Sequence, residues 1–344
     1  GPGGTGKTRL ALEAAVRDLD RYEDGLFFVP LAEARTPDDV FTAIGRELNI
    51  DLPPEGSRID GLRIALANRR VLLLLDNFEQ ITDGAADVVD LLSSCPHLTA
   101  LVTSREALRV RGERLFPVAP LSIPARSATL EEVMASEAVR LFVERAVEVQ
   151  PSFTITDVNA ATIAEICTRL DGLPLAIELA TARLRIFSPT DLLSRLERRL
   201  DLLKGGARDL PGRQQTIRAA IQWSFELLDD HDRMLCLLVS AFAGARFEDV
   251  EAVALGIDAF ADTDVIDGLQ SLVDKSLVRR IDDDSPWFAM LGTIRDYAQE
   301  QLATDPDLAA AVRRTHADHY CTMARNLRPL LTGSDRESAL LQLT

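Results

Sequence analysis

The first eight residues carry the spacing G-x-x-x-x-G-K-T, which is typical of loops that bind phosphate groups. Gly3, Gly4 and Gly6 allow the backbone to turn so that successive N–H groups converge on one anion. A helical pattern begins directly after Thr8, and the positive end of such a helix also attracts anions. The motif therefore predicts binding of a nucleotide through the backbone of residues 3–6, Thr5 included.

Three side chains at the end of this motif complete the predicted nucleotide site. Lys7 is expected to reach the β- and γ-phosphates, and the hydroxyl of Thr8 is expected to bind Mg²⁺. Arg9 follows them at the start of the helix and belongs to the same predicted set. A phosphate loop normally follows a buried strand, so we expect that strand upstream of Gly1, in a longer protein.

A second acidic motif follows a run of five apolar residues, Val71–Leu75. Apolar residues without alternation are typical of a central parallel strand that is buried on both faces. Asp76 comes directly after this run, at the strand end where α/β sheets place their ligands. Asp76 is therefore predicted to hold Mg²⁺, directly or through water, and Glu79 is the nearest acid that follows.

An arginine follows a third expected strand, Leu98–Thr103. Arg105 at this position is poised to contact a phosphate or the attacking water, as in P-loop NTPase chemistry. The alternative is a surface arginine that pairs with Glu106 or Glu113.

The elements that must position these residues form an α/β pattern over residues 1–122. Further strands are expected at Gly25–Leu31 and Arg114–Val118, and a helix at Pro37–Leu48 with Thr36 as its N-cap. We therefore predict an α/β P-loop NTPase core with a parallel sheet and helices on both faces. The proline-spaced segment Pro120–Pro124 is expected to be an extended hinge.

Beyond this hinge the pattern becomes almost entirely helical. Residues 123–204 predict a helical lid domain, in which Pro174 lies in the first turn of a helix. Gly205–Gly206 is the clearest linker, and residues 208–291 then predict three helices and a β-hairpin, a winged-helix domain. Residues 292–344 are expected to be a helical linker or the start of helical repeats.

Composition excludes several classes of function. The 344 residues carry a net charge of −16, which argues against a nucleic-acid grip by this segment alone. No run of about 18 uncharged apolar residues occurs, so no membrane span is expected. The four cysteines lie far apart and predict a reduced, cytosolic protein with buried thiols; they are Cys95, Cys167, Cys236 and Cys321.

Two smaller patterns leave alternatives open. His316 and His319 are three residues apart and offer half of a metal site, but a solvated helix surface is the simpler interpretation. The third helix of the winged-helix segment, within Asp262–Lys275, carries four acids against one base, a poor surface for a DNA groove. Asp282–Asp284 is expected to be a charged hairpin tip.

Five motifs in order give this chain a family resemblance over nearly its whole length. It resembles the NB-ARC/STAND signalling ATPases, and within them the branch found in large bacterial transcriptional regulators. The resemblance implies a lid and a winged helix that pack on the nucleotide, with ADP holding a closed state and ATP permitting opening and self-association. Its motifs are Gly1–Thr8, Leu72–Asp76, Thr103–Arg105, Gly172–Ala176 and Phe288–Met290.

The resemblance also implies roles for single residues. Pro174 would lie against the adenine or ribose, and Arg105 would be the sensor near the γ-phosphate, beside the catalytic residues Lys7 and Asp76. Many relatives carry a second acid where this chain has Asn77, so either Glu79 replaces it or hydrolysis is very slow. Relatives from plants and animals carry a histidine where this chain has Leu291, so control by the winged helix is expected to be weaker or differently wired.

The leading hypothesis is a cytoplasmic switch that binds ATP or ADP with Mg²⁺ and hydrolyses ATP slowly. Its expected partners are nucleotide, a second copy in the ATP state and an unidentified signal ligand or protein, with DNA contacted only through domains outside this chain. One alternative is a catalytic P-loop enzyme, such as a small-molecule kinase or motor ATPase. The other is a DNA-binding winged-helix module.

Overall fold

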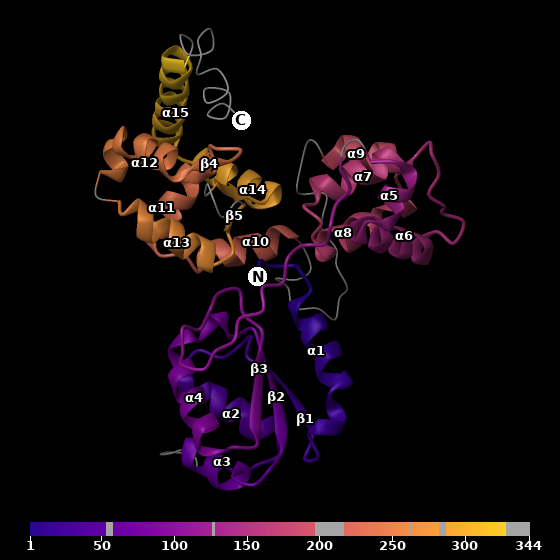
Figure 1. Cartoon of the computed structure of the whole chain (residues 1–344), viewed down its shortest axis with the longest axis vertical. Coiled ribbons are helices and arrows are strands. Elements are labelled where there is room, and N and C mark those ends of the chain that lie inside the picture. Colours follow the sequence, from indigo (N-terminus) through magenta and orange to yellow (C-terminus); the bar gives the residue numbers. More distant parts are fainter. Residues whose placement is uncertain (53–57, 126–127, 197–216, 262, 282–286, 328–344) are drawn as a thin grey trace.

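The computed structural model describes residues 1–344 except 53–57, 126–127, 197–216, 262, 282–286 and 328–344. Its α/β body carries the sheet, and two helical bodies lie at one end of that sheet (Figure 1). The predicted linker Gly205–Gly206 and the predicted hairpin tip Asp282–Asp284 lie outside the described residues.

The α/β body contains a parallel three-stranded sheet in the order β1-β2-β3. The strands are β1 (Leu26–Pro30), β2 (Val71–Asp76) and β3 (Leu98–Val102). All six residues of β2 are buried, as expected of a central strand of apolar residues. The carboxyl ends of β2 and β3 therefore bring Asp76 and Thr103 to the same edge of the sheet.

The prediction of helices on both faces is confirmed. Helix α1 (Lys7–Arg17) covers one face, where Ala11 and Ala15 pack with Leu72 and Leu74. Three helices cover the opposite face, as Figure 1 shows. They are α2 (Pro37–Glu47), which begins with a capping box of Thr36 and Asp39, α3 (Arg58–Leu66) and α4 (Ala85–Ser94).

The expected strand at Arg114–Val118 is wrong. This segment forms no strand, and Leu115 and Phe116 are 67% and 79% exposed. A strand requires a neighbour for its ladder of hydrogen bonds, and no described strand pairs with this segment. Pro117 also has no N–H to contribute. The apolar residues were therefore a misleading signal.

The first helical body is the predicted lid. Its third helix, α7, is followed by Asp171 and Gly172, both with positive φ (53° and 63°), so the chain reverses there as expected of a helix end. Pro174 is the first residue of α8, also as expected. The helices are α5 (Leu130–Ala135), α6 (Glu137–Val149), α7 (Ala160–Arg169), α8 (Pro174–Thr181) and α9 (Pro189–Leu196).

The second helical body contains the expected helices and hairpin together with a strand that the sequence did not reveal. β4 (Ala245–Arg246) pairs with β6 in the antiparallel order β4-β6-β5, and two residues are too short to show an alternating pattern. The other elements are α10 (Ile217–Glu226), α11 (Asp230–Val239), α12 (Phe247–Leu255), α13 (Val265–Asp274), β5 (Val278–Arg280), β6 (Trp287–Met290), α14 (Gly292–Leu302) and α15 (Pro306–Leu327).

The two histidines of α15 are half-buried and contact neighbouring residues, so their interpretation as solvated helix surface is only partly right. His319 Nε2 lies 2.7 Å from Asp249 Oδ1 of α12. The His316 ring lies edge-on to Phe242, with ring centroids 4.7 Å apart, and burial lowers the pKa of His316. These contacts attach α15 to the rest of the second helical body.

The cysteines agree with the predicted reduced state in most respects. All four are free; three are buried as expected, whereas Cys321 on α15 is exposed. In the described part of the chain, every helix is too short or too polar to span a lipid bilayer.

Candidate functional site

The glycine-rich loop before α1 has the geometry of an anion cradle. Gly4 and Gly6 have φ of 81° and 85°, a conformation that side-chain-bearing residues rarely adopt. A Cβ on Gly4 would lie 3.2 Å from the Leu175 Cβ, so the loop is also closely packed. Within the described residues, the backbone N–H groups of residues 3–6 donate to no protein atom. These N–H groups are therefore available to a phosphate.

Lys7 lies inside this loop. Its Nζ donates to the carbonyl oxygens of Gly1 and Pro2, at 2.6 and 2.9 Å. Burial lowers the pKa of Lys7 to about 8; the nearby charge of Arg105 adds to this, whereas Glu79 and Asp76 oppose it. Lys7 therefore remains charged at neutral pH, and a phosphate would be a stronger acceptor than the two carbonyls.

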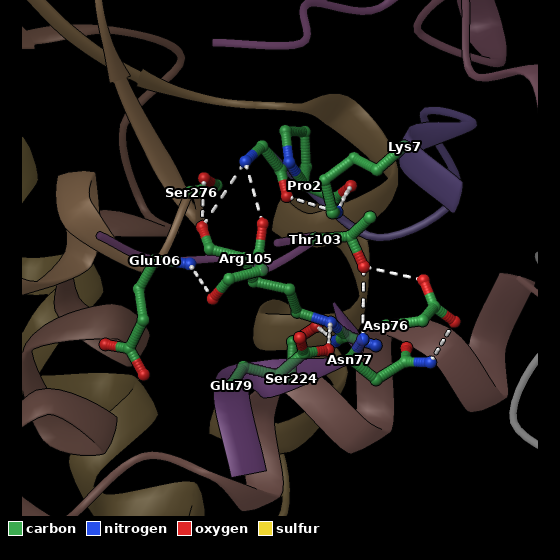
Figure 2. A network of polar contacts seen from close by, with 12 residues as sticks. Pro2, Lys7, Asp76, Asn77, Glu79, Thr103, Arg105, Glu106, Ser224 and Ser276 are labelled. Atoms are coloured by element: carbon green, nitrogen blue, oxygen red, sulfur yellow. Dashed lines mark hydrogen bonds and ion pairs between the residues drawn. The ribbon is translucent and has the colours of Figure 1, made fainter. Parts of the chain in front are cut away.

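The predicted metal ligands are adjacent to one another. Thr8 Oγ1 donates to Asp76 Oδ1 at 2.7 Å, and Thr103 Oγ1 donates to the same oxygen at 2.6 Å (Figure 2 shows Thr103 and Asp76). Asp76 is only 4% exposed. A buried carboxylate beside a hydroxyl oxygen is a set of hard oxygen donors, which fits Mg²⁺.

Asn77 supports Asp76. Its Nδ2 donates to Asp76 Oδ2 at 2.6 Å, and its backbone N–H donates to Thr103 Oγ1 at 3.1 Å. Its φ is 64°, a left-handed conformation that asparagine tolerates better than most residues. The Asn77 side chain, which stands where a second acid is common in relatives, therefore orients the Asp76 carboxylate and offers no carboxylate base of its own.

Glu79 and Arg105 form a buried ion pair at the same sheet edge. Arg105 Nε lies 3.1 Å from Glu79 Oε1, and the two side chains are 11% and 4% exposed. The alternative of a surface arginine paired with Glu106 or Glu113 is therefore wrong. Arg105 also donates from Nη1 to Ser224 Oγ on α10, so it joins the α/β body to the second helical body (Figure 2).

The lid reaches the same loop through the start of α8. The backbone N–H of Leu175 donates to the carbonyl oxygen of Gly4 at 3.2 Å. Pro174, the residue before Leu175, is therefore held beside the glycine-rich loop. Arg9 is farther from the cluster. Its side chain is 77% exposed and lies 3.8 Å from Glu178 of α8. The structure thus brings the predicted site residues together at the carboxyl edge of the sheet. Arg9 is the exception, because its side chain is exposed and lies toward α8.

Sequence reasoning did not assign Thr103, Ser224 and Ser276 to the site. Thr103 follows the last residue of β3 and is the first residue of the motif Thr103–Arg105, so its position was an available signal. Ser276 Oγ donates to the backbone carbonyl of Arg105 at 2.8 Å. Ser224 and Ser276 lie more than 100 residues from Arg105 in the sequence, and no local pattern reveals them.

Comparison with known proteins places these observations in context. Residues 228–303 match the family model of a winged helix-turn-helix domain. The Mycobacterium tuberculosis protein Rv0890c, which carries the name of an HTH-type transcriptional regulator, is 42% identical over 334 residues. That alignment covers 95% of this chain but only 36% of Rv0890c, so this chain spans about a third of the regulator's length.

A second mycobacterial relative is matched over most of its own length. Rv0894 of M. tuberculosis, described as an uncharacterized protein, is 35% identical over 317 residues, which are 91% of this chain and 78% of Rv0894. Among solved structures, Aeropyrum pernix ORC2 in ADPNP–ADP complexes aligns with a TM-score of 0.47 at 13% identity, covering 91% of this chain and 86% of that one. The chain belongs to the same family as Rv0894.

Proposed function

We propose that this member of the Rv0894 family is a nucleotide-binding switch of the NB-ARC/STAND class, in the cytoplasm, within a larger regulator. The observation that carries this proposal is Arg105. It is paired with Glu79 at the carboxyl edge of the sheet and also bound to Ser224 on α10 of the second helical body, which contains the matched winged-helix residues 228–303 and is called the winged-helix body below. Loss or gain of a phosphate at this edge would therefore act on a residue that also joins two domains. A nucleotide-dependent switch requires such a link between ligand and domain arrangement.

Binding is assigned to the loop and its two motif side chains. The N–H groups of residues 3–6 and the Lys7 ammonium would hold the phosphates, and Pro174 would lie near the base or ribose. Thr8 and Asp76 would hold Mg²⁺, which when bound neutralises phosphate charge. The protein's own contribution is to exchange internal hydrogen bonds, such as those from Lys7 to Gly1 and Pro2, for bonds to the ligand.

Slow hydrolysis is expected because neither Asn77 nor Glu79 offers a free carboxylate to activate the attacking water. Asn77 is bound to Asp76 and cannot accept a proton from water as a carboxylate does. Glu79 is the remaining candidate, but Arg105 holds its carboxylate. A γ-phosphate that attracts Arg105 would at once release Glu79 and weaken the contact with Ser224. ATP would thereby loosen the docking of the second helical body on the α/β body and favour an open, self-associating arrangement, whereas ADP would favour the closed one.

The match to a winged helix-turn-helix domain supports a second candidate, DNA binding by this body. Helix α13, the third helix within the matched residues 228–303, argues against this candidate. Asp267 and Gln270 on it are exposed, and Asp274 forms an ion pair with Arg109 of the α/β body. A mobility-shift assay at low and physiological salt separates the two. A specific complex with this chain would favour the DNA-binding module; we expect none.

The deciding experiment measures nucleotide in the protein itself. We expect ADP or ATP to be released when freshly purified protein is denatured, and calorimetry to show tight ADP binding. Lys7→Ala should weaken ADP binding by about 100-fold or more, because it removes a buried charge-assisted contact. Arg17→Ala, an exposed cation on the same helix, is the matched control and should bind normally. Absence of nucleotide binding in the unmodified protein would overturn the proposal.

A further inference from the structure

One carboxylate of the lid caps a helix of the winged-helix body. Asp171 accepts three hydrogen bonds at the start of α14: from Gly292 N at 2.9 Å, from Thr293 N at 2.8 Å and from Thr293 Oγ1 at 2.9 Å. The partners are more than 120 residues apart in the sequence. A carboxylate at a helix N-terminus is favoured by the free N–H groups and by the helix dipole.

The space around this contact is closely fitted. A Cβ on Gly292 would lie 3.3 Å from Asp171 Oδ1, so a larger residue there would press on the carboxylate. Thr293 is 1% exposed, and its hydroxyl has Asp171 as its acceptor. The Leu173 and Leu291 side chains, next to these residues in the chain, are buried in one continuous core. The contact is therefore a defined junction between the two helical bodies.

The residues that follow Asp171 reach the phosphate loop within four positions. The carbonyl oxygen of Gly172 accepts from Leu121 N at 3.0 Å, in the segment that connects the α/β body to the lid. A Cβ on Gly172 would lie 2.2 Å from the Leu121 carbonyl oxygen, so this approach requires glycine. Leu175 N then donates to Gly4 O. A single short loop thus contacts α14, the connecting segment and the phosphate loop.

We propose that Asp171 is a positioning residue that sets how long nucleotide remains bound. By tying the lid to the N-terminus of α14, it fixes the loop that presents Pro174 and closes on Gly4. This inference rests on the proposed nucleotide site. It adds that the contact of Asp171 with Gly292 and Thr293 regulates nucleotide release from that site. The lid cannot move away from the winged-helix body without breaking all three hydrogen bonds, so loss of the carboxylate favours the open arrangement.

The first test is the rate of ADP release from the full chain, followed with a fluorescent ADP analogue. Asp171→Asn keeps the side-chain size but removes the charge, and we expect release to become about tenfold faster. Thr293→Val removes only the hydroxyl donor and should accelerate release less. The double variant should resemble Asp171→Asn, because both changes act on the same contact.

The matched control is Asp264→Asn. Asp264 also caps a helix, by accepting from Asp267 N at 3.1 Å, but its contact lies within the winged-helix body. We expect it to leave ADP release unchanged even where it lowers the melting temperature. Equal acceleration by both variants would assign the effect to general destabilisation and overturn the proposal.

Amide hydrogen exchange measures the contact between Asp171 and the start of α14 directly, in protein without added nucleotide. The amides of Gly292 and Thr293 should exchange faster in Asp171→Asn and be unchanged in Asp264→Asn. Unchanged ADP release from Asp171→Asn, in a protein whose wild type binds ADP, would overturn this inference alone. A wild type that does not bind ADP would overturn the proposed function and this inference together, so the two failures are distinguishable.

Discussion

Two polar clusters lie side by side at the carboxyl edge of the sheet, and they differ in where their partners come from. In the first, Asp76 is surrounded by Thr8 and Thr103, all within the α/β body. In the second, Arg105 contacts both Glu79 of the same body and Ser224 on α10 of the second helical body. The first cluster is complete within one domain, whereas the second is complete only when two domains are docked.

The difference implies a division of labour under the proposed function. Changes to the first cluster should act on binding of metal and phosphate, with little effect on how the domains pack. Changes to the second should act on stability and on communication between domains. The first two predictions below test whether the two clusters separate in this way, and the third tests the neighbouring Lys7.

The largest effect is expected from Arg105→Ala. It leaves the Glu79 carboxylate buried without its cation, which typically costs about 3–5 kcal/mol of unfolding free energy. Chemical denaturation followed by circular dichroism measures this cost. Arg109→Ala is the matched control, because Arg109 also joins the α/β body to the winged-helix body but is 68% exposed. Its loss should cost no more than about 1 kcal/mol.

Equal costs for the two arginines would contradict the comparison. They would show that burial of the Glu79–Arg105 pair contributes nothing beyond an ordinary surface contact.

A smaller effect is expected from Asp76→Asn in the first cluster. The amide retains one acceptor for the two threonine hydroxyls but loses the charge that attracts Mg²⁺. We expect the gain in ADP affinity that Mg²⁺ provides to fall by at least about tenfold, as for other disturbed metal sites. Calorimetric titrations in Mg²⁺ and in EDTA measure this gain. Affinity in EDTA should change little, and an equal loss under both conditions would exclude a metal-specific role.

The smallest effect is a dependence of binding on pH. Burial lowers the pKa of Lys7 to about 8, and phosphate binds the protonated form. ADP affinity should therefore be nearly constant below pH 7.5 and decline as pH rises through 8, by about threefold between pH 7.5 and 8.5. The Lys7→Ala variant should lack this decline. A decline of the same size in that variant would assign the titration to another group.

Sequence reasoning succeeded where the signal is local. The phosphate loop, the buried strand that ends at Asp76 and the helix that begins at Pro174 each occupy a few adjacent residues. It failed at Arg114–Val118, because a strand depends on a neighbour that the segment itself does not specify. It also missed the contacts of His316 and His319, whose partial burial depends on residues far away in the sequence.

The sequence by itself determined the glycine-rich turn before α1 and the buried strand that ends at Asp76, because fixed spacing places those groups on one turn and one strand end. Only the tertiary structure decided which residues face them across domain boundaries. Ser224 lies 119 residues from Arg105, and Gly292 lies 121 residues from Asp171. Such contacts depend on how the bodies dock, and that is set by packing over the whole core.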